Sequence, residues 1–160
     1  MLYHLVPKEY LEAIGDIVVS HNLLEWYLVD LLMVLTGLSK PELRVFAAEM
    51  SSRQLRQAAT SFAAEKWEKA DSESINKLMK RHEHLEKGRN DVVHSVWGSG
   101  VSLGQRKATK IKFAAKQGLK LSYQTYGKDE LEKLAKDMRI LAEDLLDFRN
   151  KLNGSKALPK

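Results

Sequence analysis

Cysteine is absent from the 160 residues of this chain. Its absence excludes disulfide bonds and thiolate metal sites, and a reducing cytoplasm is the natural setting for such a chain. The first residues, MLYHLVPKEYLEAIGD, also lack the basic flank, apolar segment and small-residue cleavage site of a secretory signal. We therefore expect a cytoplasmic protein.

A long uninterrupted hydrophobic run is also missing. The longest apolar stretch, residues 23–38, contains Glu25 and Asp30 and is followed at once by Ser-Lys-Pro. Charged residues inside such a stretch favour a helix in a protein core over a membrane span. We therefore expect no membrane insertion.

Acidic residues are absent between Val92 and Lys128, although the net charge of the whole chain is only +5. The basic residues of this stretch are Arg106, Lys107, Lys110, Lys112, Lys116, Lys120 and Lys128. Within residues 106–120, lysines that interleave with Ile111 and Phe113 can follow an RNA backbone. They can equally form a solvated hairpin surface that resists edge-to-edge aggregation. The sequence leaves both interpretations open.

Apolar periodicity predicts one helical domain over residues 1–154 and a frayed tail over 155–160. A spacing close to 3.5 residues predicts one helix over 7–36, ended by Gly37. Further helices are predicted over 39–50, from Ser51 or Ser52 through Trp67, from Asp71 through the stripe that reaches Val96, and from Lys128 to Gly154.

The segment between the last two predicted helices has a different pattern. Residues 101–126 alternate loosely, with Gln117-Gly118 near the middle, which predicts a hairpin of 107–113 against 119–126. The predicted fold is thus mainly α: a four- to five-helix up-down bundle with a short β-hairpin or irregular insert before the last helix.

The run GRNDVVHSVWG at 88–98 is the strongest candidate for a functional site. Arg89 falls on an apolar stripe, where a solvated arginine would be out of place. Asn90 and His94 are four residues apart on one helix face, and His82 and Glu86 continue that polar face. Arg89 and His94 are five apart, so within one chain they flank a groove more readily than they touch.

These residue types suit cleavage of RNA without a metal or cofactor. A histidine supplies a near-neutral acid or base, an arginine supplies fixed positive charge for the phosphorane, and a polar residue orients them. His82 and His84 do not suggest a metal site, because side chains two residues apart on a helix point in nearly opposite directions.

The six residues RNDVVH, Arg89 to His94, resemble the R-x(4–6)-H motif of the HEPN superfamily, in which asparagine often follows the arginine. A long first helix with an internal Glu25, short following helices and a closing helix after an insert add to the resemblance. The resemblance implies a metal-independent endoribonuclease whose paired protomers share one cleft. It implies that His94 moves the proton, Arg89 stabilises the scissile phosphate and Asn90 positions it, which leaves 2′,3′-cyclic phosphate ends. Such proteins often act as toxins or in phage defence, with a neutralising antitoxin.

A second interpretation belongs to another class of protein. Relatives that have lost activity act as helical modules that dimerise or bind RNA or protein, so Arg89, Asn90 and His94 can also be a structural polar cluster. His21 and Glu25 lie on the first helix's apolar stripe, where burial requires hydrogen bonding, and we hypothesise that Glu25 holds Arg89. Trp97 can stack on a base or anchor the packing of the helix end.

Overall fold

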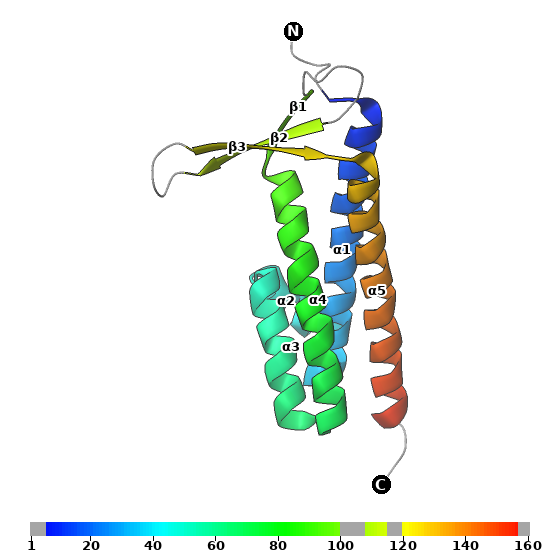
Figure 1. Ribbon diagram of the computed structural model, residues 1–160. Helices are drawn as coiled ribbons and strands as arrows, with labels where there is room; N and C mark the ends of the chain where they lie inside the picture. The colour runs from blue at the N-terminus through cyan, green and yellow to red at the C-terminus, as the bar shows by residue number, and fades with distance from the viewer. Residues whose placement is uncertain (1–5, 100–107, 115–119, 157–160) are drawn as a thin grey trace.

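The computed structural model describes residues 6–99, 108–114 and 120–156. Within these ranges five helices and three strands follow one another, and the long helices run up and down beside each other (Figure 1). The predicted mainly α bundle, with a short hairpin before its last helix, is confirmed.

The first helix, α1 (Lys8–Thr36), is a core helix of the bundle. It ends at Gly37, as predicted, where a left-handed φ of 76° lets the glycine N–H donate to the Met33 carbonyl at 2.9 Å. Within the described ranges, α1 is the one helix long and apolar enough to cross a membrane by length and composition. Its leucines, including Leu24, Leu28 and Leu31, are buried among the other helices.

Two short helices follow, and each begins at a capping box. Ser39 caps α2 (Lys40–Ala48) together with Glu42, and Ser51 caps α3 (Ser52–Lys66) together with Gln54. Both starts are as predicted from the serines, whereas α2 ends at Ala48 and not at Met50.

The ends of the two remaining helices differ from the prediction. The helix α4 (Lys69–Val93) begins before Asp71, because the extended backbone of Glu68 forms its N-cap. Val96 is not on its stripe but in a strand, where it is 53% exposed. The helix α5 (Lys128–Lys156) continues through Gly154, since that glycine lacks the left-handed φ that would end a helix. Residues 157–160 of the predicted tail lie outside the described residues.

A three-stranded antiparallel sheet lies between α4 and α5 in the order of the chain. The strands β2 (Ala108–Ala114) and β3 (Lys120–Tyr126) pair from Ala108 opposite Tyr126 to Ala114 opposite Lys120, which is the predicted hairpin shifted by one residue. The strand β1 (Val96–Ser99) pairs with the other edge of β2 and was not predicted. The sheet therefore begins shortly after α4 ends (Figure 1).

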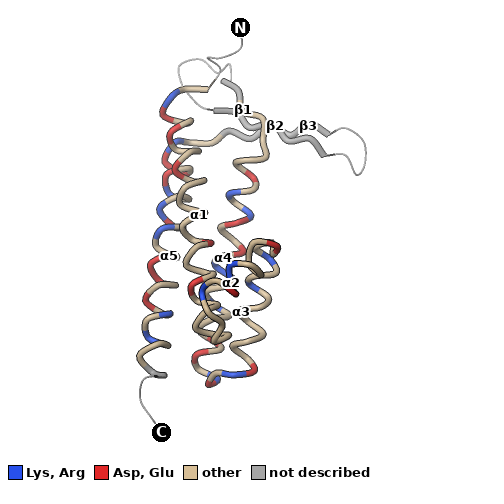
Figure 2. Tube along the Cα trace, turned by 180° about the vertical axis from the view of Figure 1, so that it is seen from behind, with Lys and Arg blue, Asp and Glu red and all other residues tan. Residues whose placement is uncertain are grey.

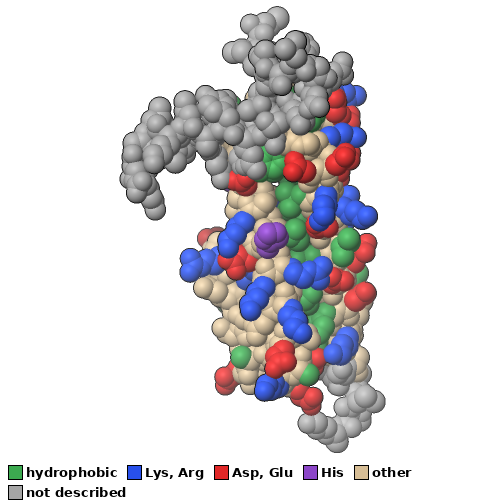
Figure 3. Space-filling view, in the orientation of Figure 1, with side chains coloured by type: hydrophobic (Ala, Val, Ile, Leu, Met, Phe, Trp, Pro, Cys, Tyr) green, Lys and Arg blue, Asp and Glu red, His purple; other side chains and the backbone are tan. Residues whose placement is uncertain are grey.

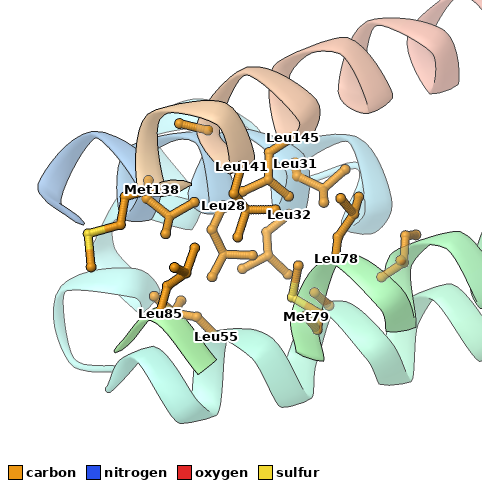
Figure 4. Packing of buried hydrophobic residues seen from close by; sticks show 14 of the residues in the cluster. Leu28, Leu31, Leu32, Leu55, Leu78, Met79, Leu85, Met138, Leu141 and Leu145 are labelled. Carbon is orange, nitrogen blue, oxygen red and sulfur yellow. The ribbon is translucent and has the colours of Figure 1, made fainter. Parts of the chain in front are cut away.

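One hydrophobic cluster joins the long helices. Leucine and methionine side chains from α1, α3, α4 and α5 converge on it (Figure 4). The labelled members are Leu28, Leu31, Leu32, Leu55, Leu78, Met79, Leu85, Met138, Leu141 and Leu145. Each such side chain contributes about 1.5–3 kcal/mol when fully buried. Acidic and basic residues are interspersed along α5 (Figure 2). The cluster fixes α4, the helix that carries the motif, against three neighbours.

Candidate functional site

The RNDVVH motif forms the last turn of α4 and its C-cap. Arg89 is half-buried, and its Nη1 donates to Asn90 Oδ1 at 2.9 Å. His94 is the C-cap residue, and its backbone N–H donates to the Asn90 carbonyl at 3.1 Å while its side chain is exposed. No hydrogen bond joins Arg89 to His94 among the described residues. The motif thus holds Arg89 and Asn90 together and leaves the imidazole of His94 open to solvent.

Contacts with the sheet fix the end of α4. The Trp97 indole N–H donates to the Val92 carbonyl at 2.8 Å, and the Tyr126 hydroxyl donates to Asp91 Oδ2 at 2.9 Å. The rings of Trp97 and Tyr126 lie 5.6 Å apart between centroids. Burial, and to a lesser extent Glu130, raises the pKa of Tyr126 above its ordinary value. Trp97 therefore has the position of a packing anchor, one of the two roles expected for it, and it restrains the backbone on either side of His94.

Buried and half-buried polar side chains also gather where α1, α3 and α4 meet. We call this group the ionic cluster, and its members are His21, Glu25, Arg56, His82 and Glu86. Arg56 is the centre: its Nη1 donates to Glu86 Oε2 and lies 3.2 Å from His82 Nδ1. The His21 and His82 rings meet edge to face, with 6.1 Å between their centroids. The cluster is one turn of α4 below the motif, because Glu86 and Asn90 are four residues apart.

The structure alters two expectations for this group. Glu25 accepts a hydrogen bond from Ser52 Oγ and its Oε2 lies 3.9 Å from His21 Nδ1, and no contact with Arg89 is found in the described part of the chain. The hypothesis that Glu25 holds Arg89 is therefore wrong for the single chain, because α3 supplies a closer partner. The expected hydrogen bonding of His21 is also wrong, since neither ring nitrogen has a hydrogen-bond partner in the described part of the chain.

Sequence reasoning missed Arg56. Its neighbours Leu55, Ala59 and Ala63 form the buried stripe of α3, and Arg56 lies three residues before Ala59, at the edge of that stripe. The spacing was a weak signal, since an arginine at a stripe's edge usually extends to solvent. Its burial depends on Glu86 and His82, which are 30 and 26 residues away in the chain.

The buried histidines are neutral near pH 7. Burial lowers the pKa of His82 to about 3, with smaller contributions from the charges of Arg56 and His21. Burial is also the main cause that lowers the pKa of His21, and Arg89 and Arg56 act in the same direction while Glu25 and Glu86 oppose it. A protonated His82 would place a second positive charge beside Arg56 and away from water, so the folded protein favours the neutral imidazole.

The depressed pKa of His82 predicts acid-sensitive folding. In the unfolded chain a histidine binds a proton near pH 6.5, whereas folded His82 does not bind one until about pH 3. The contribution of neutral His82 to stability is therefore fully present above pH 6.5 and is lost as the pH falls from 6.5 towards 3. The slope is about 1.4 kcal/mol per pH unit, or about 2 kcal/mol lost between about pH 6.5 and 5. We expect urea titrations of the wild type to show this fall in the free energy of unfolding. In His82→Gln the fall over the same pH range should be smaller by about 2 kcal/mol.

The exposed His84 on the same helix provides the control for this comparison. His84→Gln removes a histidine that is not in the core, so its unfolding free energy should follow the wild-type pH dependence. An equal pH dependence in His82→Gln and the wild type would contradict the assignment of the acid sensitivity to His82.

The basic residues expected to bind RNA are placed only in part. Lys110 and Lys112 belong to β2 and Lys120 to β3, whereas Arg106, Lys107 and Lys116 lie outside the described residues. Lys128 is the first residue of α5 and pairs with Glu132 at 2.9 Å. RNA binding by the hairpin therefore stays a prediction.

The site consists of the exposed imidazole of His94 and the guanidinium of Arg89, which is held by the amide of Asn90. The ionic cluster lies one turn of α4 before them. Within the described ranges, no group of three His, Asp or Glu side chains could hold a metal ion. Comparison of the chain with models of protein families, with curated proteins and with solved structures finds no match.

Proposed function

We propose that this protein is a metal-independent endoribonuclease of HEPN type, with the motif of α4 as its site. The observation that carries the proposal is the placement of the three motif side chains. His94 is exposed at the fixed end of α4, and Arg89 is held by Asn90 one turn before it. An acid or base that reaches solvent and a positioned cation beside it are what phosphodiester cleavage requires.

The proposed reaction uses the ribose 2′-hydroxyl as nucleophile. His94 accepts the 2′-OH proton as the 2′-oxygen attacks phosphorus, and the bond from phosphorus to the 5′-oxygen breaks. Arg89 stabilises the negative charge of the phosphorane. Among the described residues its guanidinium donates one hydrogen bond, from Nη1 to Asn90, so it keeps further N–H donors for the phosphate oxygens. The products are a 2′,3′-cyclic phosphate and a 5′-hydroxyl, and the departing 5′-oxygen takes up a proton from solvent water while protonated His94 returns its proton to solvent.

A second chain would complete the site. No hydrogen bond joins Arg89 to His94 within the described part of one chain, so one protomer's arginine and the other's histidine are the natural pair across a two-fold axis. Since the motif lies at the end of its helix, two copies can bring their ends together without rearrangement of the core. A toxin or phage-defence role with a neutralising antitoxin belongs to the same proposal, and it predicts poor growth on expression that Arg89→Ala or His94→Ala relieves.

The activity is tested with total RNA in EDTA. We expect the purified protein to cleave it, to leave 2′,3′-cyclic phosphate ends and to spare an oligonucleotide that is 2′-deoxy throughout, because that strand lacks the nucleophile. His94→Ala is the inactive control that excludes a contaminating nuclease. If wild type and His94→Ala leave RNA equally intact, or degrade it equally, the enzyme proposal fails.

Exposed apolar side chains favour a second candidate, a non-catalytic module that binds a protein partner or another copy. Val19 and Trp26 on α1 are 67% and 50% exposed, and Val45 and Phe46 on α2 are 69% and 59% exposed. Apolar side chains gathered at a surface commonly mark protein interfaces. Substitution of Val45 and Phe46 by serine that abolishes dimerisation, together with RNA left intact by the wild type, would support this candidate over the enzyme.

A further inference from the structure

A groove between α3 and α4 carries charge that neither the motif nor the ionic cluster accounts for. It has a volume of about 770 Å³ and four cationic side chains against two carboxylates in its lining. Along α4 its lining runs from Asn76 to Asn90, which corresponds to about 21 Å of helix. Lys and Arg side chains also gather around an exposed histidine over α4 and α5 (Figure 3).

Both carboxylates of the groove are already paired. Glu86 accepts from Arg56, and Glu83 pairs with Lys87 at 2.7 Å. The hydrogen bond and the charge of Lys87 hold the pKa of Glu83 below its ordinary value, so the carboxylate stays ionised beside its partner. The negative charges of the groove are therefore neutralised from within.

Two cations of the groove form no ion pair within the described residues, although the charge of Arg53 helps to lower the pKa of Glu83. Arg53 on α3 and Lys80 on α4 are exposed, and in the described part of the chain neither makes a hydrogen bond or an ion pair. Polar side chains that can bond to phosphate or ribose oxygens, Gln57, Thr60 and Asn76, complete its walls. None of its lining residues is aromatic, so the groove offers contacts to a backbone and no platform for bases.

The groove leads to the motif. Asn90, which holds Arg89, lines the groove as well. The helices α3 and α4 are joined by a short turn and run antiparallel, so Arg53 near the start of α3 lies toward the Asn90 end of the groove. Lys80 lies farther from Asn90, toward the start of α4. A strand in the groove would meet these cations in turn before it reaches Asn90.

We propose that the α3–α4 groove binds the phosphate backbone of the RNA strand and directs it to the motif, with Arg53 and Lys80 as its main phosphate contacts. The proposal rests on the proposed ribonuclease function for the identity of the ligand. Because the contacts are to phosphates, binding depends strongly on salt and weakly on base sequence.

The test uses the full chain and a single-stranded 2′-O-methyl RNA of mixed sequence, which lacks the 2′-hydroxyl and cannot be cleaved. Fluorescence anisotropy at several salt concentrations is compared for the wild type and Arg53→Gln/Lys80→Gln. The matched control is Lys40→Gln/Arg44→Gln, which also removes one lysine and one arginine. The control pair lies on α2, where both cations lie over the ring of Trp26 and form no ion pair among the described residues.

We expect Arg53→Gln/Lys80→Gln to bind about tenfold more weakly. We also expect it to lower the slope of log K against log salt by about 1.4, because each phosphate left without its cation accounts for about 0.7 of the slope. The control should bind like the wild type. Equal affinity and slope for the groove variant and the wild type would overturn the proposal, as would an equally weakened affinity in the control.

The two proposals fail in different ways. If the wild type cleaves RNA in EDTA and the groove variant binds as tightly as the wild type, the groove proposal alone is wrong. If the groove variant binds weakly and the wild type leaves RNA intact, the ribonuclease proposal alone is wrong. Unchanged thermal unfolding of the groove variant, expected because both side chains are exposed, assigns a loss of binding to the missing charges.

Discussion

His94→Ala is expected to cleave RNA at least about 100-fold more slowly than the wild type, since a positioned general acid or base contributes about 10²–10⁴-fold. The imidazole is exposed at the C-cap of α4, so its removal leaves no cavity in the core. Single-turnover cleavage of a labelled RNA in EDTA measures the effect. His84→Ala, which removes another exposed histidine from α4, should retain the wild-type rate. Equal rates for His94→Ala and the wild type would exclude His94 from catalysis.

The same variant tests whether the site is shared by two chains. If the arginine of one protomer acts with the histidine of its partner, a mixed dimer of Arg89→Ala and His94→Ala has one intact site and one empty site. Random exchange makes half of the dimers mixed, so the mixture should recover about a quarter of the wild-type rate although each variant alone is inactive. A mixture that stays inactive would place both groups of a site on one chain.

The helices were predictable from the sequence because local chemistry determines them. Gly37 ends α1 and the serines at 39 and 51 begin the next two helices, and each of these residues acts on backbone groups within a few positions. The buried stripe of α4 through Ile75, Leu78 and Leu85 follows from periodicity in the same way.

Features that depend on distant partners were not predictable in this way. The strand β1 exists because residues 96–99 pair with residues 108–111. Periodicity alone placed Val96 at the end of the helix stripe and predicted no strand there. Arg56 is buried because α4 supplies Glu86 and His82. Periodicity indicated His21, Glu25 and Glu86 as supporting residues. It did not indicate Arg56, which contacts Glu86 and His82 from α3, a helix where no site was expected.

The pair of Arg56 and Glu86 should be the most sensitive point of the fold. The two side chains are 11% and 20% exposed, so removal of one partner leaves a nearly buried charge without compensation. Loss of one partner of a buried pair typically costs about 3–5 kcal/mol. We therefore expect Glu86→Leu to lower the free energy of unfolding by about that amount, measured by urea denaturation at pH 7. Arg56→Met should cost less, because the Glu86 side chain is 20% exposed and can be hydrated by solvent.

The double variant Arg56→Met/Glu86→Leu separates the two costs. It removes both charges and keeps apolar volume, so it should be more stable than Glu86→Leu alone, since apolar replacement of a whole buried pair is often nearly neutral. Arg81 and Asp144 form the matched control pair, with atoms 2.6 Å apart but side chains 48% and 40% exposed. Their coupling energy in the same double-mutant cycle should be below about 1 kcal/mol. Equal coupling energies for the two pairs would mean that burial does not set the strength of the Arg56–Glu86 interaction.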